Sequence, residues 1–247
     1  MKERLDSAMA RRGLAASRES ARLLIMAGRV RVNSRPASKP DLRVDLAAEI
    51  AVVGKLAEYA SRGAYKLLAA LDHFAVDVSG RYALDVGAST GGFTDVMLRR
   101  GAAHVIALDV GYGQIAERLR ADARVTVMDR TNIRLTHAEN LPYAPDLVTV
   151  DTSFISLKLV LPPILEIAAS AVDIVALIKP QFEVGKGKVG KGGVVRDDAL
   201  RAQAVEDVLD FAAGLGLEQK GSIESPIKGA AGNREYLALL RRQARSD

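Results

Sequence analysis

The sequence lacks cysteine altogether, which excludes disulfide bonds and every zinc site built on thiolates. It has only three histidines, and the spacing of His73, His104 and His137 does not predict a metal site. No run reaches the roughly 20 consecutive apolar residues that a membrane span requires. The first residues, MKERLDSAMARRG, also lack the apolar core of a secretory signal. We therefore expect a cytoplasmic protein without a metal ion or a membrane segment.

Positive charge is concentrated at one end of the chain. Residues 1–39 hold 10 basic and 3 acidic side chains, whereas residues 61–247 hold 23 of each sign. A cationic segment of this kind is typical of proteins that bind a polyanion, because binding releases the counterions condensed on it. A basic surface that is merely hydrated is the alternative. The charge distribution favours a nucleic acid as the partner of the N-terminal segment.

Residues 1–57 predict a small α+β domain that begins with two short helices. Leu5, Ala8 and Met9 fall on one face of the first helix. Ser17 is the expected N-cap of the second helix. The remaining elements are a helix over 18–27, a strand over 30–32, a turn over 33–36 and strand-like residues over 44–53.

This pattern resembles the RNA-binding domain named after small-subunit ribosomal protein S-four, and the resemblance implies RNA as the partner. Arg18 and Arg22 lie one helical turn apart, so they are expected to project together. The residues that carry the resemblance are Arg4-Leu5-Asp6, Gly13, Ser17-Arg18, Ala21, Leu24-Ile25 and Gly28-Arg29-Val30-Arg31-Val32-Asn33. The arginines expected to contact RNA are Arg4, Arg11, Arg18, Arg22, Arg29 and Arg31.

Residues 58–247 predict a larger α/β domain. Strands alternate with helical stretches along this part of the chain, a pattern typical of a mostly parallel central sheet. Pro162-Pro163 must lie near the start of its helix or kink it. The expected strands are 82–86, 105–109, 125–128, 146–151 and 174–178, with two antiparallel strands at 222–225 and 235–240, and the expected helices are 94–100, 158–170 and 198–213.

A glycine-rich turn follows the first of these strands. Gly87, Gly91 and Gly92 permit positive φ and the close approach of a ligand. A Walker-type phosphate loop needs a lysine after its last glycine, where Phe93 stands. A dinucleotide fingerprint needs the spacing G-x-G-x-x-G, which these glycines do not have. A loop that binds S-adenosylmethionine is the interpretation left.

Acidic residues at successive strand ends support a cofactor site. Asp85 precedes the first glycine of the turn. Asp109 ends the next strand, where a carboxylate can bind both ribose hydroxyls of the cofactor. Asp129 ends the third strand, near the position expected for the adenine. The carboxyl ends of parallel strands meet at the crevice where such folds bind ligands. Taken singly, each aspartate is better explained as a helix cap or turn residue. The residues expected to bind the cofactor are Asp85, Gly87, Ala88, Ser89, Thr90, Gly91, Gly92, Phe93, Asp109 and Asp129.

Four polar residues stand where the surrounding pattern predicts core positions or strand ends. Asp151 ends the fourth strand, Lys179 follows a buried strand, and Glu235 opens the last strand. Lys66 lies earlier, in Ser61-Arg62-Gly63-Ala64-Tyr65-Lys66-Leu67. A lysine at a strand end can also simply reach out to solvent. In this order, the four residues resemble the catalytic set of the FtsJ-like ribose 2′-O-methyltransferases.

Longer motifs narrow the resemblance to the TlyA-type ribosomal RNA methyltransferases, historically labelled haemolysin A. The matching segments are 61–67, 85–94, 109–114, 151–157, 179–187 and 192–195. The resemblance implies a Rossmann-like methyltransferase fold, S-adenosylmethionine as cofactor, and cytidine 2′-hydroxyls of the two large ribosomal RNAs, in ribosomal subunits, as substrate. A non-catalytic RNA- or ribosome-binding factor and a haemolysin-like membrane-active protein are the alternatives.

Lys179 is the expected general base, which removes a proton from the ribose hydroxyl as the methyl group is transferred. Burial or a second cation such as Lys66 favours the neutral form that a base needs, whereas Asp151 and Glu235 orient the two amines. The glycine- and lysine-rich run 185–192 is expected to form a loop, in which Lys186 and Lys188 contact RNA phosphates or stay hydrated. Phe154 is either a stacking partner for the target base or a core residue.

Overall fold

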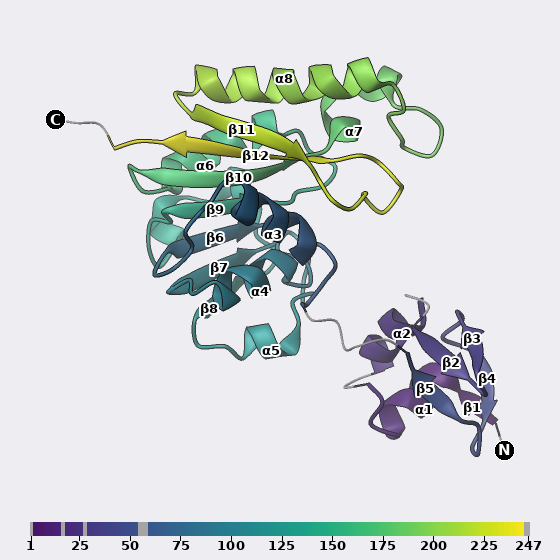
Figure 1. Ribbon diagram of the computed structural model, residues 1–247. Coiled ribbons are helices and arrows are strands. Elements are labelled where there is room, and N and C mark those ends of the chain that lie inside the picture. The colour runs from purple at the N-terminus through teal and green to yellow at the C-terminus, as the bar shows by residue number, and fades with distance from the viewer. Residues whose placement is uncertain (1, 16–17, 27–28, 54–58, 245–247) are drawn as a thin grey trace. The chain divides into compact units, whose positions relative to one another are not determined.

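The computed structural model describes residues 2–15, 18–26, 29–53 and 59–244. The chain divides into two units, residues 1–58 and residues 59–247, which Figure 1 colours purple to dark blue and blue to yellow. The boundary expected between residues 57 and 58 lies in the segment 54–58, outside the described residues, as does the expected N-cap Ser17.

The N-terminal unit is an α+β domain built around one small core. As expected, Leu5, Ala8 and Met9 of the first helix are fully buried, and they pack against Ala21 and Ile25 of the second. Strands β1 and β4 form an antiparallel pair, and β3, β2 and β5 form a three-stranded antiparallel sheet. The elements are β1 (Lys2–Arg4), α1 (Leu5–Arg11), α2 (Arg18–Met26), β2 (Val30–Val32), β3 (Arg35–Ala37), β4 (Arg43–Asp45) and β5 (Ile50–Val52).

The hairpin between β2 and β3 is tighter than the sequence suggests. Asn33 and Ser34 both have positive φ, 48° and 65°, which matches the two-residue turn whose twist fits a hairpin. Arg35 and Pro36, expected in the turn, already pair with β2. The strand-like run 44–53 is likewise two short strands, because the chain turns between β4 and β5.

The C-terminal unit alternates strands and helices as predicted. Pro162 and Pro163 lie in the first turn of α6, where proline is tolerated, and the expected helix 158–170 is divided into η3 and α6. The elements are α3 (Ala64–His73), β6 (Tyr82–Val86), α4 (Gly92–Arg99), β7 (His104–Leu108), α5 (Glu117–Arg120), β8 (Val125–Met128), η1 (Ile133–Leu135), η2 (Ala138–Asn140), β9 (Leu147–Val150), η3 (Leu157–Leu159), α6 (Leu161–Ile167), β10 (Val172–Ile178), α7 (Pro180–Glu183), η4 (Lys186–Lys188), α8 (Asp198–Gly214), β11 (Glu218–Glu224) and β12 (Tyr236–Arg242).

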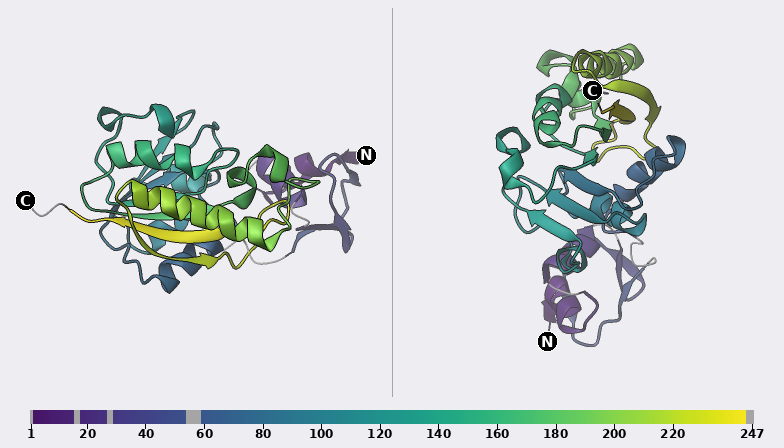
Figure 2. Two further views of the ribbon diagram at one scale, coloured as in Figure 1. Left: turned by 90° about the horizontal axis from the view of Figure 1, so that it is seen from above. Right: turned by 90° about the vertical axis from the view of Figure 1, so that its left-hand side faces the viewer.

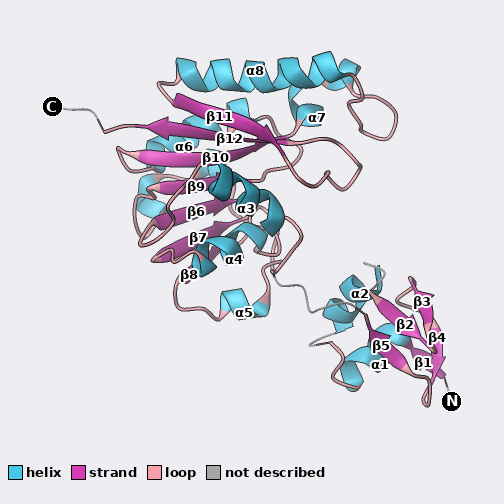
Figure 3. Ribbon diagram, in the orientation of Figure 1, coloured by secondary structure: helices cyan, strands magenta, loops and turns pink. Residues whose placement is uncertain are grey.

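A seven-stranded sheet runs through this unit in the order β11-β12-β10-β9-β6-β7-β8 (Figure 3). Strands β10, β9, β6, β7 and β8 are parallel, whereas β12 is antiparallel to both of its neighbours. The start of β12 therefore lies at the same edge as the carboxyl ends of the parallel strands. This mostly parallel, Rossmann-like sheet confirms the predicted fold class.

Helices cover both faces of the sheet (Figure 2). Successive strand residues point to opposite faces, so Ala83 packs with α3 and α4 whereas Leu84 packs with α6 and α8. Burial on both faces explains the nearly continuous apolar strands, such as the fully buried β10. The two layers of helices leave the carboxyl edge of the sheet to the connecting loops.

Candidate active site

Two lysine–carboxylate pairs lie at the carboxyl edge of the sheet. The Lys66 Nζ is 2.5 Å from Glu235 Oε2, and the Lys179 Nζ is 2.6 Å from Asp151 Oδ1. Asp151 and Lys179 directly follow the parallel strands β9 and β10. Glu235 reaches the same edge because β12 is antiparallel, with Tyr236 opposite Ile178 of β10. The structure thus brings together the four residues that the sequence singled out.

Three of the four residues are buried. Lys66, Lys179 and Glu235 are 8%, 7% and 3% exposed, whereas the Asp151 side chain is 24% exposed. Lys66 stands in the first turn of α3, which packs against β12. The Lys179 amine also donates to the Ser153 hydroxyl at 2.9 Å. Ser153, which no sequence pattern singles out, holds the amine from a second direction.

Two hollows meet beside these pairs. The larger, of about 620 Å³, contains all four residues of the pairs in its lining. The smaller, of about 440 Å³, lies over the ends of β6 and β7 and has an apolar floor of Leu108, Ile133 and Val160. Their shared walls are Gly87, Ser89, Asp151, Ser153 and Phe154.

Gly87 allows the two hollows to exist. Its φ is +85°, and a Cβ there would lie 2.6 Å from the Asp151 carbonyl oxygen. Gly91 serves a different purpose from the one expected, because it begins α4 and faces Leu119 and Ile115 rather than either hollow. Gly92 lines the larger hollow and leaves room for the Ser61 hydroxyl.

Asp109 lies in the smaller hollow, as expected of a ribose ligand. Its carboxylate is oriented by the backbone N–H groups of Ser89, at 2.8 Å, and Gly111, at 2.7 Å. Ser89 lines both hollows, whereas the larger one alone is lined by Ala88, Thr90, Phe93 and the buried Asp85.

Asp129 is not where the sequence suggests. It accepts from Arg120 at 2.9 Å and from the Gly113 N–H at 3.2 Å, and it is absent from the walls of both hollows. The chain turns sharply at Arg130, which has a φ of 54°, so Asn132 reaches the hollow instead. Asn132, which no sequence pattern marks, lines the smaller hollow at this position.

Asp85 is a buried carboxyl beneath the glycine loop. Burial raises its pKa from 3.8 to about 6, although hydrogen bonds from Thr94 and Thr149 act in the opposite direction. It accepts from the Thr94 N–H and hydroxyl and from the Thr149 hydroxyl. It therefore ties the start of α4 to β6 and β9.

Replacing Asp85 by asparagine is expected to remove a pH-dependent loss of stability. Because the pKa is raised in the folded state, the contribution of Asp85 to stability is full below 3.8 and is lost as pH rises through about 6. The free energy of unfolding of the variant, relative to the wild type, should rise by about 1.4 kcal/mol between about pH 5 and about pH 8. Urea unfolding of both proteins measures this difference, and a difference independent of pH would contradict the assignment.

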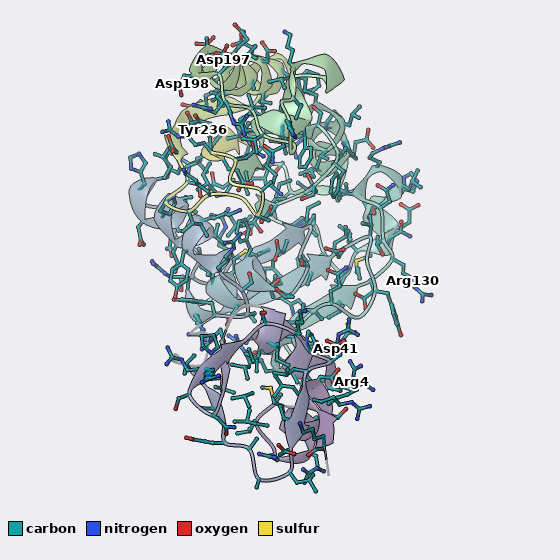
Figure 4. All side chains as sticks on the ribbon, turned by 90° about the vertical axis from the view of Figure 1, so that its right-hand side faces the viewer. Arg4, Asp41, Arg130, Asp197, Asp198 and Tyr236 are labelled. Atoms are coloured by element: carbon teal, nitrogen blue, oxygen red, sulfur yellow. The ribbon has the colours of Figure 1, made fainter. Side chains whose placement is uncertain are left out.

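Three of the N-terminal arginines expected to contact RNA form ion pairs within their own unit. Arg4 and Arg18 share the buried Asp6, and Arg11 pairs with Glu3. The Arg4 hydrogen bond holds the pKa of Asp6 far below its usual range, despite burial. Figure 4 shows Arg4 at the surface of this unit. Of the other arginines expected to contact RNA, Arg29 donates to the Val53 carbonyl, and Arg22 and Arg31 are exposed.

The lysine-rich loop is anchored at its C-terminal end. Asn233, only 2% exposed, accepts from the Val195 N–H and donates to the Gly193 carbonyl. Arg201 donates to the Val195 carbonyl and pairs with Asp198, which Figure 4 shows at the start of α8. Lys188 is exposed, and the Lys186 side chain lies outside the described part of the chain.

Comparison with known proteins identifies both units of the chain. The family model for the FtsJ-like methyltransferase matches residues 59–242, and that for the S4 domain matches residues 3–50. The 16S/23S rRNA (cytidine-2′-O)-methyltransferase TlyA of Mycobacterium tuberculosis is 52% identical over 241 residues, which cover 97% of this chain and 90% of the relative. Hemolysin A of Brachyspira hyodysenteriae is 39% identical, over 95% of this chain and 98% of the relative.

A solved structure from Streptococcus thermophilus, which carries a hemolysin name, superposes with a TM-score of 0.77 at 40% identity, over 98% of this chain and 89% of that chain. The fold and the site together define an FtsJ-like methyltransferase joined to an S4-type RNA-binding domain. Within that class, the chain belongs to the TlyA family of ribosomal RNA methyltransferases. Among the described residues, no helix has the length and apolar character needed to cross a bilayer, and no three potential metal ligands gather.

Proposed function

We propose that this protein transfers a methyl group from S-adenosylmethionine to the 2′-hydroxyl of cytidines in ribosomal RNA. The observation that carries the proposal is the Lys179–Asp151 pair, which stands where a nucleoside-sized hollow opens into a larger one. The relative that shares 52% of its residues is named for this reaction. Ribosomal RNA as the substrate implies the cytoplasm as the site of action.

The residues of the smaller hollow suit S-adenosylmethionine. Asp109 offers a carboxylate to ribose hydroxyls, the floor is apolar enough for an adenine, and Asn132 supplies an amide beside it. Gly87 lets the backbone approach the ligand, and a Cβ there would collide with the Asp151 carbonyl oxygen in the wall that the two hollows share. When bound, the cofactor supplies an electrophilic methyl group on a sulfonium ion.

The larger hollow holds the machinery for the acceptor. A ribose hydroxyl is a weak nucleophile and must lose its proton as the new bond forms, so a positioned base contributes about 10²–10⁴-fold. We assign that role to Lys179, whose amine is held by Asp151 and Ser153 and has a third direction free for the hydroxyl. Alignment of the hydroxyl contributes further, on the order of several kcal/mol.

Lys66 and Glu235 form the second wall of the acceptor site. Their pair is more buried than the first, and Gly229 leaves the space that the Glu235 carboxylate occupies. A buried pair of this kind holds both side chains in one geometry, because separating the charges leaves one of them unpaired in the interior. We assign to this pair the positioning of the ribose against Lys179.

RNA recognition is assigned to the exposed cations of both units. Arg22 and Arg31 are exposed on the N-terminal unit, and Arg4, Arg11 and Arg18 keep part of their guanidinium surface open to solvent. Lys188 is exposed in the lysine-rich loop, with Lys186 two positions before it in sequence. Phe154 is 91% exposed, which removes the core alternative and leaves stacking on a base.

Methyl transfer to ribosomal subunits tests the proposal. The protein is incubated with tritiated S-adenosylmethionine and with small and large subunits from a strain that lacks it, and 2′-O-methyl groups are mapped in the RNA. Label in a cytidine 2′-O-methyl group of either subunit is expected. Cofactor binding by calorimetry without transfer to any subunit would instead support a non-catalytic ribosome-binding factor. Leakage of liposomes at micromolar protein would support the membrane-active alternative.

A further inference from the structure

A third hollow lies beside the acceptor site. This outer groove, of about 550 Å³, is lined by Arg134, Phe154, Ile155, Ser156, Leu159, Gln181, Phe182, Gly185 and Val189. Phe154, Gln181 and Phe182 also line the larger hollow, so these three residues form a partition between the two spaces. Any chain that fills the acceptor site can continue into the outer groove across this partition.

The loop that carries Phe154 is tied to the short helix that carries Phe182. Phe154 has a φ of 65°, which is uncommon for a bulky residue. Two residues further along the loop, the Ser156 hydroxyl donates to Glu183 at 2.5 Å, and the Leu157 N–H donates to Glu183 at 2.9 Å. These bonds tie the loop after β9 to α7, which also carries Phe182. The two rings lie 5.2 Å apart at 48° and present aromatic surface to both spaces.

Gln181 contributes to the partition a side-chain oxygen that lacks a hydrogen bond among the described residues. Its Oε1 is buried, and the structure gives it no hydrogen-bond partner among the described residues. A buried acceptor without a partner is unfavourable, so a ligand that supplies a donor is favoured at this position. An amide can offer both a donor and an acceptor to the edge of a nucleobase once it turns toward that base.

We propose that the outer groove binds the nucleotide next to the target cytidine in the RNA strand. The inference rests on the proposed function, because it takes the acceptor site to hold a nucleotide. The aromatic partition stacks the neighbouring base, Gln181 contacts a base edge, and the exposed Arg134 pairs with a phosphate. An apolar peptide would leave both the guanidinium and the amide unpaired, so a nucleotide fits this chemistry better.

A matched pair of tryptophan substitutions tests the groove. Leu159 lines the outer groove and is 56% exposed, so Leu159→Trp fills the groove with little effect on folding. Leu135→Trp is the control, because Leu135 is 72% exposed but does not line the groove. Leu159→Trp is expected to raise KM for ribosomal subunits on the order of tenfold, which is the loss of about one stacked base, at unchanged kcat and cofactor affinity. Equal KM values for the two variants would overturn the proposal.

Measurements of nucleotide binding distinguish a failure of this inference from a failure of the proposed function. Cytidylyl-adenosine, adenylyl-cytidine and the cytidine monophosphates are titrated into the full chain with S-adenosylhomocysteine present. At least one dinucleotide is expected to bind the wild type on the order of tenfold tighter than either mononucleotide, and Leu159→Trp should remove that advantage. If the dinucleotide still binds Leu159→Trp more tightly than the mononucleotides do, the outer groove does not bind the second nucleotide. Absence of methyl transfer by the wild type refutes the proposed function, and the dinucleotide comparison still decides the groove.

Discussion

Replacing Lys179 by alanine is expected to lower kcat for methyl transfer by about 10²–10⁴-fold, with affinity for S-adenosylmethionine unchanged. Lys179 is 7% exposed, and its amine is held between Asp151 and Ser153, a position from which alanine offers no group that can accept a proton. Lys179 lines the larger hollow only, whereas Asp109 and Asn132, the residues assigned to the ribose and the adenine of the cofactor, line the smaller one. Single-turnover transfer and calorimetry of cofactor binding measure the two effects separately.

Lys179→Arg distinguishes a base from a mere positive charge. Arginine keeps an ion pair with Asp151, but its guanidinium does not lose its proton in proteins. If Lys179 removes the hydroxyl proton, this variant should be as slow as Lys179→Ala. Transfer restored to near the wild-type rate would show that the charge alone suffices and would reject the role of base.

Lys220→Ala is the matched control for these variants. Lys220 also forms a short ion pair with a carboxylate, Glu218, but it does so on β11 and is absent from the walls of the three hollows described above. Its loss is expected to change neither transfer nor cofactor binding, because an exposed pair contributes at most about 1 kcal/mol. A comparable loss of activity in the control would mean that the Lys179 effect is not local.

The sequence predicted the position of the site because the topology leaves few alternatives. Polar residues that directly follow buried parallel strands must lie at one edge of the sheet, which located Asp109, Asp151 and Lys179. Lys66 and Glu235 were selected on the resemblance to the FtsJ-like catalytic set, and the antiparallel direction of β12 explains why Glu235 reaches that edge. The catalytic and binding roles of these residues stay predictions.

The parts that the sequence could not predict depend on single loop conformations. Asp129 was expected in the cofactor site, but a positive φ at Arg130 and the proximity of Arg120 turn the chain away. Ser153 and Gln181 occupy loop or short-helix positions that no periodicity marks, so their contacts appear only in three dimensions. Likewise, no spacing rule tells which lysine pairs with which carboxylate, because Lys66 and Glu235 are 169 residues apart.

Gly87→Ala is expected to abolish cofactor binding and to lower stability. The Cβ would lie 2.6 Å from the Asp151 carbonyl oxygen and 3.0 Å from its carbonyl carbon, and neither backbone atom can rotate away as a side chain would. Relief of the clash must move the strand end that carries Asp151, which opens the wall shared by both hollows. The positive φ of 85° adds a cost of about 1–2 kcal/mol for any residue with a Cβ.

Gly80→Ala separates the clash from the backbone strain. Gly80 precedes the other end of the same strand β6 and has a similar φ of +71°, but a Cβ there would meet no atom within 4 Å. Both variants therefore carry the strain, and only Gly87→Ala carries the collision with Asp151. Calorimetry should show wild-type cofactor affinity for Gly80→Ala and no measurable binding for Gly87→Ala, with urea unfolding reporting the stability of each. If both variants bound the cofactor with equal affinity, the collision with Asp151 would have no effect and backbone strain alone would explain both results. The backbone at Gly87 would then not shape the cofactor site.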